Sequence, residues 1–142
     1  MRNRIQNMEI KQIYTGCLAQ GSYYIKCNGE AAIVDPLREV QQYIDMAEKD
    51  GVKIKYVFET HFHADFVSGH VTLAEKTGAE IIYGPTAKTG FTSTIAEDGQ
   101  KFKVGKLEIE VLQPGDRTDF TRIPATPTMT VRLTYQLSKP VD

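Results

Sequence analysis

Short runs of β-branched and aromatic residues open the chain and predict antiparallel strands. Two such runs cover residues 10–18 and 23–27, and Asn28-Gly29 is typical of a type I′ turn that leads into a third run over 31–34. Pro36 ends the third run, because proline fixes φ and has no amide proton for a ladder of hydrogen bonds. We therefore expect the chain to open with hairpins.

The apolar positions then change twice to helical spacing. Residues 38–50 form the first helical stretch, which Gly51 closes, and Gly78 closes the second. Short β-branched runs follow each stretch, over 54–59 and over 81–83. This order of strand, helix, strand, helix and strand implies right-handed parallel crossovers, with ligands expected at the carboxyl ends of the strands.

The last third of the chain is less regular. Residues 86–99 have the small polar composition of a surface loop, and a hairpin follows over 102–111 with Gly105-Lys106 as its turn. Residues 113–127 contain three prolines and little periodicity, and only 128–137 again reads as a strand.

Composition and charge narrow the class of protein. The 142 residues suffice for one domain with its own core, and the formal net charge of −1 comes from interspersed acidic and basic residues. This balance argues against a nucleic-acid partner or a membrane surface, and no apolar run would span a bilayer. Two cysteines, Cys17 and Cys27, do not make a disulfide framework, so we expect a protein of the reducing cytoplasm. We expect both cysteines to behave as small, buried, apolar side chains. Residues 1–8 lack the apolar core of a secretory signal.

The concentrated chemistry lies between Thr60 and His70, a stretch that holds all three histidines. A regular strand would present His61 and His63 on one side, and Asp65 follows two residues later. Imidazole and carboxylate groups are ligands for zinc and non-haem iron. We therefore predict a metal site that includes His61, His63 and Asp65. His70 reads as a residue on the face of the second helix.

Three segments carry a resemblance to a known family. They are Ala31-Ala32-Ile33-Val34-Asp35-Pro36, Thr60-His61-Phe62-His63-Ala64-Asp65 and Ser68-Gly69. Together with the helix between them, these segments resemble the N-terminal half of a metallo-β-lactamase-fold protein. The resemblance implies an α/β (α+β) fold, the first half of an αββα sandwich, truncated and with an atypical tail. It makes residues 1–8 an extension, 9–112 the first half of the domain and 113–142 a divergent tail.

Three blocks are most similar to the persulfide dioxygenases of that superfamily, including those fused to rhodanese domains. The blocks are Gly16-Cys17-Leu18-Ala19-Gln20, Asp35-Pro36-Leu37-Arg38-Glu39-Val40 and the run from Glu59 through Gly69. The resemblance implies one iron with open positions, acting on glutathione persulfide or a related small-molecule persulfide and yielding thiol and sulfite. It makes His61 a direct ligand, with His63 and Asp65 as catalytic helpers that tune the ligands.

Phe66 separates this interpretation from the hydrolases of the same superfamily. Glyoxalase II-like enzymes often hold two metals, and the motif His-x-His-x-Asp-His supplies the second metal site through its Asp and its last His. Phe66 stands in place of that last histidine. A dinuclear hydrolase is therefore disfavoured and iron is favoured over zinc, with a zinc-dependent thioesterase as the alternative enzyme.

The C-terminal part departs from the family pattern. Members follow the hairpin with Thr-Pro-Gly-His-Thr, whose histidine is the second protein ligand, and later with an Asp that completes the set. No histidine follows His70 in this chain. Asp116 falls near the missing position and is a candidate ligand, and Thr126-Pro127-Thr128-Met129 is a second echo of the motif. We therefore expect an incomplete metal site.

Three functions follow from these expectations. The first is persulfide dioxygenase-like chemistry centred on His61, and the second is hydrolysis of thioesters by a zinc site. The third is a non-catalytic remnant, from a truncated or frame-shifted gene, that holds no metal and acts through oligomerisation. Half a sandwich exposes an apolar sheet face, so we expect a homo-oligomer.

Overall fold

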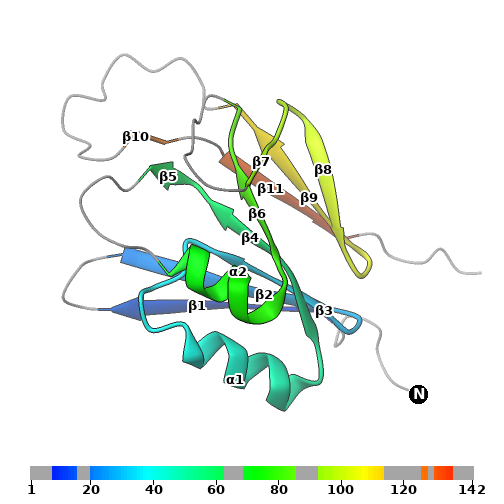
Figure 1. The fold of residues 1–142 in the computed structure, drawn as a ribbon. Coiled ribbons are helices and arrows are strands. Elements are labelled where there is room, and N and C mark those ends of the chain that lie inside the picture. Colours follow the sequence, from blue (N-terminus) through cyan, green and yellow to red (C-terminus); the bar gives the residue numbers. More distant parts are fainter. Residues whose placement is uncertain are drawn as a thin grey trace, which may run out of the picture.

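The computed structural model describes residues 8–15, 20–62, 69–85, 93–113, 126–127 and 130–135 (Figure 1). In chain order the elements are β1 (Met8–Thr15), β2 (Gln20–Cys27), β3 (Glu30–Val34), α1 (Gln41–Asp50), β4 (Lys53–Glu59), β5 (His61–Phe62), α2 (His70–Thr77), β6 (Glu80–Tyr83), β7 (Thr94–Ile95), β8 (Gln100–Val104), β9 (Leu107–Leu112), β10 (Thr126–Pro127) and β11 (Thr130–Tyr135).

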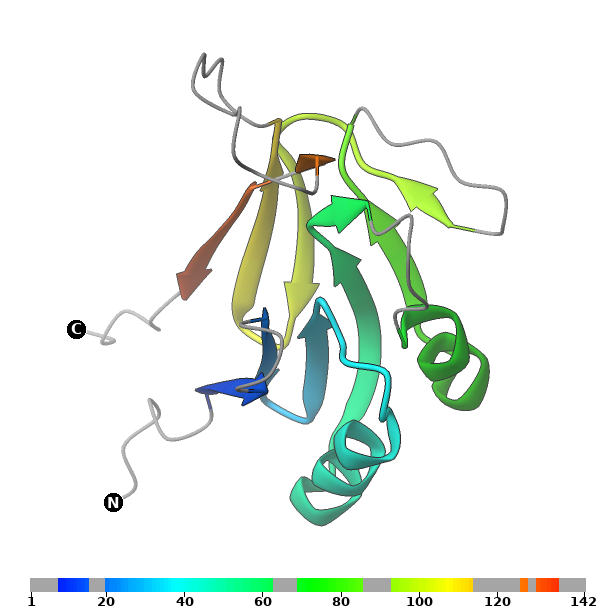
Figure 2. The same ribbon diagram turned by 90° about the vertical axis from the view of Figure 1, so that its left-hand side faces the viewer.

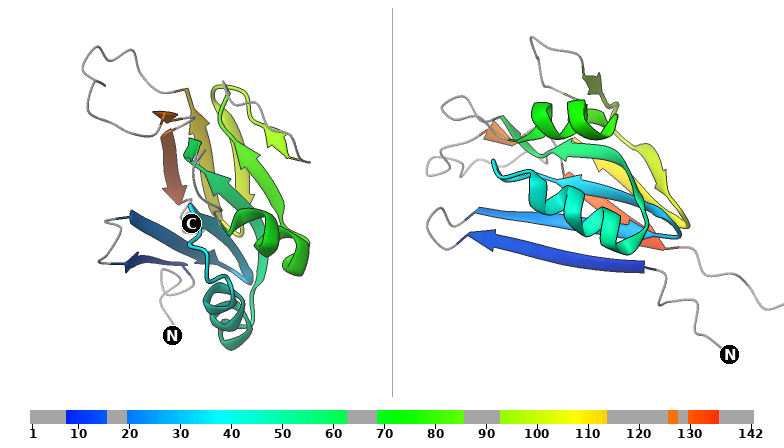
Figure 3. Two further views of the ribbon diagram at one scale, coloured as in Figure 1. Left: turned by 60° about the vertical axis from the view of Figure 1, so that its left-hand side comes forward. Right: turned by 60° about the horizontal axis from the view of Figure 1, so that its bottom comes forward.

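These elements form three layers. The middle layer is a six-stranded sheet in the order β1-β2-β3-β4-β6-β7. A three-stranded sheet in the order β11-β9-β8 lies against one face, and α1 and α2 cover the other (Figures 2 and 3). A two-stranded pairing of β5 with β10 sits beyond the end of β4. The predicted α/β class is confirmed.

The opening hairpins and their turn are confirmed. β1 pairs antiparallel with β2, and β2 pairs antiparallel with β3. Asn28 and Gly29 both have positive φ, 51° and 85°, as a type I′ turn requires. The later turn at Gly105 lies against this one, because a Cβ on Gly105 would be 2.3 Å from the carbonyl oxygen of Cys27. Only glycine fits that contact.

The parallel crossovers are confirmed as well. β3, β4 and β6 run parallel, and the helices connect them as predicted. α1 begins at Gln41, later than the helical pattern from residue 38 suggested. Leu37 and Val40 are buried in the core before the helix begins, with exposed fractions of 9% and 6%. Their apolar positions therefore belong to the segment that precedes α1. Both helices end at a left-handed glycine, Gly51 and Gly78.

Two strands, β7 and β11, test the predictions made for the C-terminal half of the chain. β7 lies within the segment predicted to be a plain loop, and it pairs in parallel with the end of β6. Two residues are too few to show a period in the sequence. β11 lies inside the predicted strand over 128–137 and pairs antiparallel with β9. The tail therefore contributes a strand to the second sheet.

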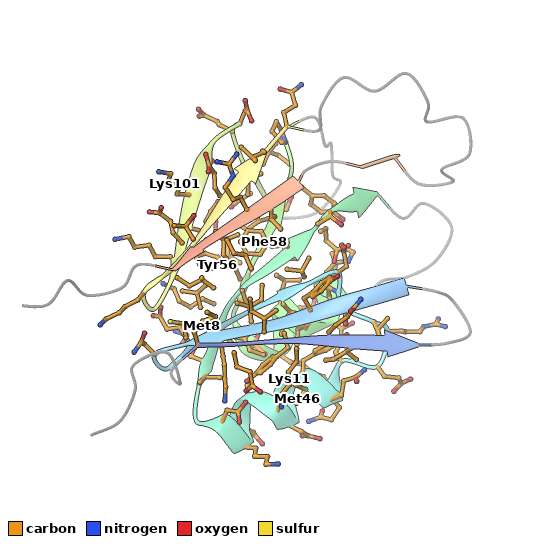
Figure 4. All side chains as sticks on the ribbon, turned by 180° about the vertical axis from the view of Figure 1, so that it is seen from behind. Met8, Lys11, Met46, Tyr56, Phe58 and Lys101 are labelled. Atoms are coloured by element: carbon orange, nitrogen blue, oxygen red, sulfur yellow. The ribbon has the colours of Figure 1, made fainter. Side chains whose placement is uncertain are left out.

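Two apolar clusters bind the layers together. The cluster under the helices comprises Tyr24, Ala31, Ile33, Leu37, Val40, Tyr43, Ala47, Ile54, Val57 and Leu73. The cluster between the sheets comprises Ile25, Cys27, Ala32, Val34, Phe58, Ile82, Ala96, Phe102, Val104, Leu107, Ile109 and Val111. In the second cluster Tyr56 and Phe58 (Figure 4) pack their rings 5.2 and 5.6 Å from that of Phe102. Burying such a side chain contributes roughly 1.5–3 kcal/mol.

The three-stranded sheet turns a charged face outward. Lys101 (Figure 4) lies 3.7 Å from Glu108, and Arg132 lies 3.7 Å from Glu110. The exposed large apolar side chains among the described residues are Ile10, Tyr23 and Ile95. This sheet therefore lacks, over its described strands, the apolar outer face from which a homo-oligomer was predicted, and the oligomer itself stays a prediction. Neither α1 nor α2 is long and apolar enough to cross a membrane.

Candidate metal centre

The histidine stretch begins where β4 ends. β4 closes at Glu59, and β5 starts at His61. The parallel neighbours of β4 end at the same edge of the sheet, β3 at Val34 and β6 at Tyr83. The prediction that this stretch begins at the carboxyl end of a parallel strand is confirmed, and this edge is where α/β sheets hold their ligands.

Asp35 fixes the start of the stretch. Its carboxylate accepts a hydrogen bond of 2.8 Å from the amide of Thr60 and another from the Thr60 hydroxyl. The amide of Asp35 donates to the carbonyl of Phe58 at 2.8 Å, and its backbone has a φ of 50°. Aspartate tolerates this left-handed backbone better than most residues. One residue therefore makes the turn after β3 and ties it to the end of β4.

A buried tyrosine holds the segment that follows Asp35. The Tyr43 hydroxyl accepts a hydrogen bond of 2.7 Å from the amide of Leu37 and shares another of 2.7 Å with Ser22. Tyr43 is fully buried. Burial raises the pKa of Tyr43, and the negative charges of Asp35 and Glu59 act in the same direction. The hydroxyl is therefore neutral and keeps this hydrogen-bonding role at physiological pH.

Gly69 fixes the far end of the stretch by close approach. A Cβ at this position would lie 2.3 Å from the carbonyl oxygen of Leu37 and 2.4 Å from Cγ1 of Val40. Its φ is −78°, so the need for glycine comes from space and not from backbone conformation. The segment after β3 therefore contacts the histidine stretch at both ends, near Thr60 and at Gly69.

His70 contributes a polar cluster that the sequence analysis missed. Its Nδ1 lies 3.6 Å from Oε1 of Glu59, and its Nε2 lies 3.3 Å from the hydroxyl of Tyr83. The Glu59 side chain is completely buried, and that of His70 is 12% exposed. Burial raises the pKa of Tyr83, and the charges of Glu59 and Asp35 add to this effect. The signal in the sequence was that Glu59 and Tyr83 each end a predicted parallel strand, at the edge of the sheet where ligands were expected.

Only part of the predicted ligand set can be placed. The structure describes the backbone of His61, while His63, Asp65 and Asp116 lie outside the described residues, as do Phe66 and Cys17. Within the described ranges, no group of three or more His, Cys, Asp or Glu side chains is arranged to hold a metal ion. Cys27 is a buried free thiol, as predicted. The donor types of the stretch suit a metal, but the ligand set itself is a prediction.

β10 brings the tail to the histidine stretch. Thr126 lies opposite Phe62 and Pro127 opposite His61 in the antiparallel pairing of β10 with β5. This pairing places Thr126 and Pro127, the first two residues of the second motif match, next to β5. In the sequence, Thr128-Met129 follows where the family pattern has Gly-His.

Comparison with known proteins agrees with this architecture. Residues 15–136 match the sequence pattern of the Metallo-beta-lactamase superfamily. A hydroxyacylglutathione hydrolase of Rhizobium etli is 36% identical over 92 residues, which are 61% of this chain and 35% of the hydrolase.

Two solved structures extend the comparison. A metallo-beta-lactamase from Staphylococcus aureus subsp. aureus COL is 34% identical, with a TM-score of 0.66, over 75% of this chain and 34% of that one. The ETHE1 protein from Myxococcus xanthus is 26% identical, with a TM-score of 0.68, over 76% of this chain and 49% of that one. The chain thus spans less than half the length of each of these three relatives. It belongs to the metallo-beta-lactamase superfamily.

Proposed function

We propose that this chain binds one divalent metal at the strand-end stretch that starts at His61, and that its chemistry is of the persulfide dioxygenase type. The observation that carries the proposal is the anchoring of this stretch. Asp35 binds Thr60 at one end, and Leu37 packs on Gly69 at the other. Such double attachment is what a ligand loop needs, because metal sites require donors held in place before the metal arrives.

His61 would hold the metal directly, with His63 and Asp65 beside it. When bound, an iron would supply open coordination positions for dioxygen and for the sulfur of a small persulfide such as glutathione persulfide. The protein groups would bind and orient the substrate and exclude water. Phe66 supports a single metal, because it replaces the histidine that supplies a second metal site in related hydrolases.

A zinc-dependent thioesterase is the second candidate. The hydroxyacylglutathione hydrolase of Rhizobium etli is 36% identical to this chain over 92 residues, which are 61% of the chain. Its name supports a glutathione thioester as the substrate class. Both candidates therefore share a glutathione-based substrate and differ in the metal and in the bond that changes.

The tail limits the expected activity of either enzyme. β10 lies beside His61, but the sequence after Pro127 offers Thr128 and Met129 and no histidine. Loss of even a supporting partner of a metal ligand costs about 10- to 100-fold in affinity or activity. We therefore propose weak turnover. A non-catalytic protein that acts by self-association, in the cytoplasm, is the third proposal.

One experiment separates the candidates. The purified chain is loaded without oxygen with Fe(II) or with Zn(II), and oxygen uptake on glutathione persulfide is compared with hydrolysis of a glutathione thioester. Oxygen uptake by the iron form alone supports the dioxygenase, and thioester hydrolysis by the zinc form alone supports the thioesterase.

Two variants control the measurement. His61→Ala should abolish whichever activity is seen, while Asp45→Asn, on the exposed face of α1, should leave it unchanged. Activity that survives in His61→Ala would contradict both enzymatic proposals. Absence of both activities, with a native fold, would favour the non-catalytic protein.

A further inference from the structure

We infer that His70 is a positioning residue for the metal stretch: it bridges the ends of β4 and β6 and holds Glu59, two residues before His61. This inference rests on the proposed function, because positioning matters only if His61 binds a metal. His70 was otherwise expected to be an ordinary residue of a helix face.

The bridge follows from the register of two strands. Glu59 and Tyr83 are the last residues of β4 and β6, and they lie opposite each other in the parallel pairing. His70 is the first residue of α2, and its two ring nitrogens reach one of these residues each, at 3.6 and 3.3 Å. The imidazole of His70 therefore connects the end of β4 to the end of β6.

The helix holds His70 in that place. The Leu73 amide donates a hydrogen bond of 2.8 Å to the carbonyl of Gly69, and the Leu73 side chain is fully buried under the sheet. Gly69 is in turn seated on Leu37. His70 thus sits on a rigid element, and its ring meets that of Tyr83 edge-on, with interplanar angle 90° and centroids 6.0 Å apart.

Loss of the His70 imidazole should disturb the backbone that leads to His61. Glu59 is completely buried, and a buried carboxylate is sensitive to every polar contact that it loses. Without the imidazole, Glu59 would lose one of its polar neighbours and would relax toward water. Only Thr60 separates Glu59 from His61, so that relaxation would move the proposed ligand directly.

The test compares graded variants of the bridge. His70→Ala removes both contacts, and His70→Asn keeps an amide at the position of Nδ1 for Glu59. Tyr83→Phe removes only the hydroxyl that faces Nε2. Tyr24→Phe is the matched control, because it also deletes a buried tyrosine hydroxyl, one that donates to Asp50 at the end of α1.

Two readouts are needed. The first is the dissociation constant and absorption spectrum of bound Co(II), which reports ligand geometry. The second is hydrogen exchange of the amides of residues 59–62, which needs no metal. We expect Co(II) binding to weaken about 10- to 100-fold in His70→Ala, less in His70→Asn and Tyr83→Phe, and not at all in Tyr24→Phe. Exchange over 59–62 should accelerate in the same order.

Each result decides the question. Unchanged exchange over 59–62 in His70→Ala would overturn the inference, whatever the metal does. Accelerated exchange with an unchanged Co(II) dissociation constant and spectrum would also overturn it, since His70 would then be merely structural. If wild type and His61→Ala bind Co(II) equally poorly, the proposed function fails. Hydrogen exchange over residues 59–62 then shows by itself whether His70 holds the end of β4.

Discussion

The carboxylate of Asp35 and the backbone of Thr60 join the ends of two parallel strands. Thr60 donates to this carboxylate through both its amide and its hydroxyl, across 25 residues of sequence. Asp35 lies directly after β3, and Thr60 directly after β4. The pair therefore sets where the histidine stretch leaves the sheet, and it links the packing of the central strands to the proposed metal site.

Asp35→Ala should destabilise the fold by about 2–3 kcal/mol. The substitution removes both acceptors of Thr60 and places alanine at a positive φ. Asp35→Asn should cost about 1 kcal/mol, because asparagine tolerates that backbone and keeps one acceptor. Urea denaturation of both variants measures the difference. Equal losses in the two variants would show that the carboxylate is not what fixes Thr60.

Gly69→Ala should cost about 2 kcal/mol or more, because its Cβ would overlap the carbonyl of Leu37. Gly78→Ala is the matched control: its added Cβ meets nothing within 4 Å and it pays only for a positive φ, about 1 kcal/mol. Thermal and urea unfolding compare the two. A Gly69→Ala variant as stable as Gly78→Ala would mean that the two segments can separate without cost.

Stability should fall steeply at alkaline pH. Burial raises the pKa of Tyr83 and of Tyr24, the latter also through its hydrogen bond to Asp50. A raised pKa in the folded state means that the neutral hydroxyl is favoured there. Its contribution is complete below about pH 10, the pKa of an unfolded tyrosine, and is lost as the pH rises above that value.

Urea midpoints between pH 8 and pH 11 test this expectation. Tyr83→Phe and Tyr24→Phe should each show a shallower decline than wild type, and the double variant the shallowest. Parallel declines in all four proteins would show that these hydroxyls do not drive the alkaline loss.

The sequence predicted most of the scaffold, and the reasons are local. Asn28-Gly29, Gly51 and Gly78 mark turns and helix ends that the structure reproduces. β7 was missed because its two residues carry no period. The Glu59, His70 and Tyr83 cluster was missed because it joins three elements, and contacts between elements leave no spacing pattern along the chain.

Only the N-terminal part of the candidate site, around His61, could be predicted from the sequence. The position of His61 at a strand end followed from the order of strands and helices. The approach of β10 to His61 could not be predicted, since residues 113–127 have too little periodicity to indicate a pairing partner. The family pattern supplied the expectation of a histidine there, and this chain has none.

Restoring that histidine should strengthen metal binding. β10 lies beside His61, so Thr128→Gly with Met129→His would place the Gly-His of the family pattern next in the chain. We expect the double variant to bind Co(II) at least about 10-fold more tightly than wild type, because an imidazole is a much better ligand for this metal than a thioether. The same pair introduced at Arg117-Thr118 is the control, and it should change nothing if β10 is the correct place.

The most direct test of the account is the metal content of the purified chain. After loading with Fe(II) and removal of excess metal, wild type and His61→Ala are compared by elemental analysis on protein of verified fold. We expect about one iron per wild-type chain, or a fraction of one if binding is weak, and none above background in His61→Ala. Equal iron in the two proteins, or two metals per chain lost together on substitution, would contradict a single metal centred on His61.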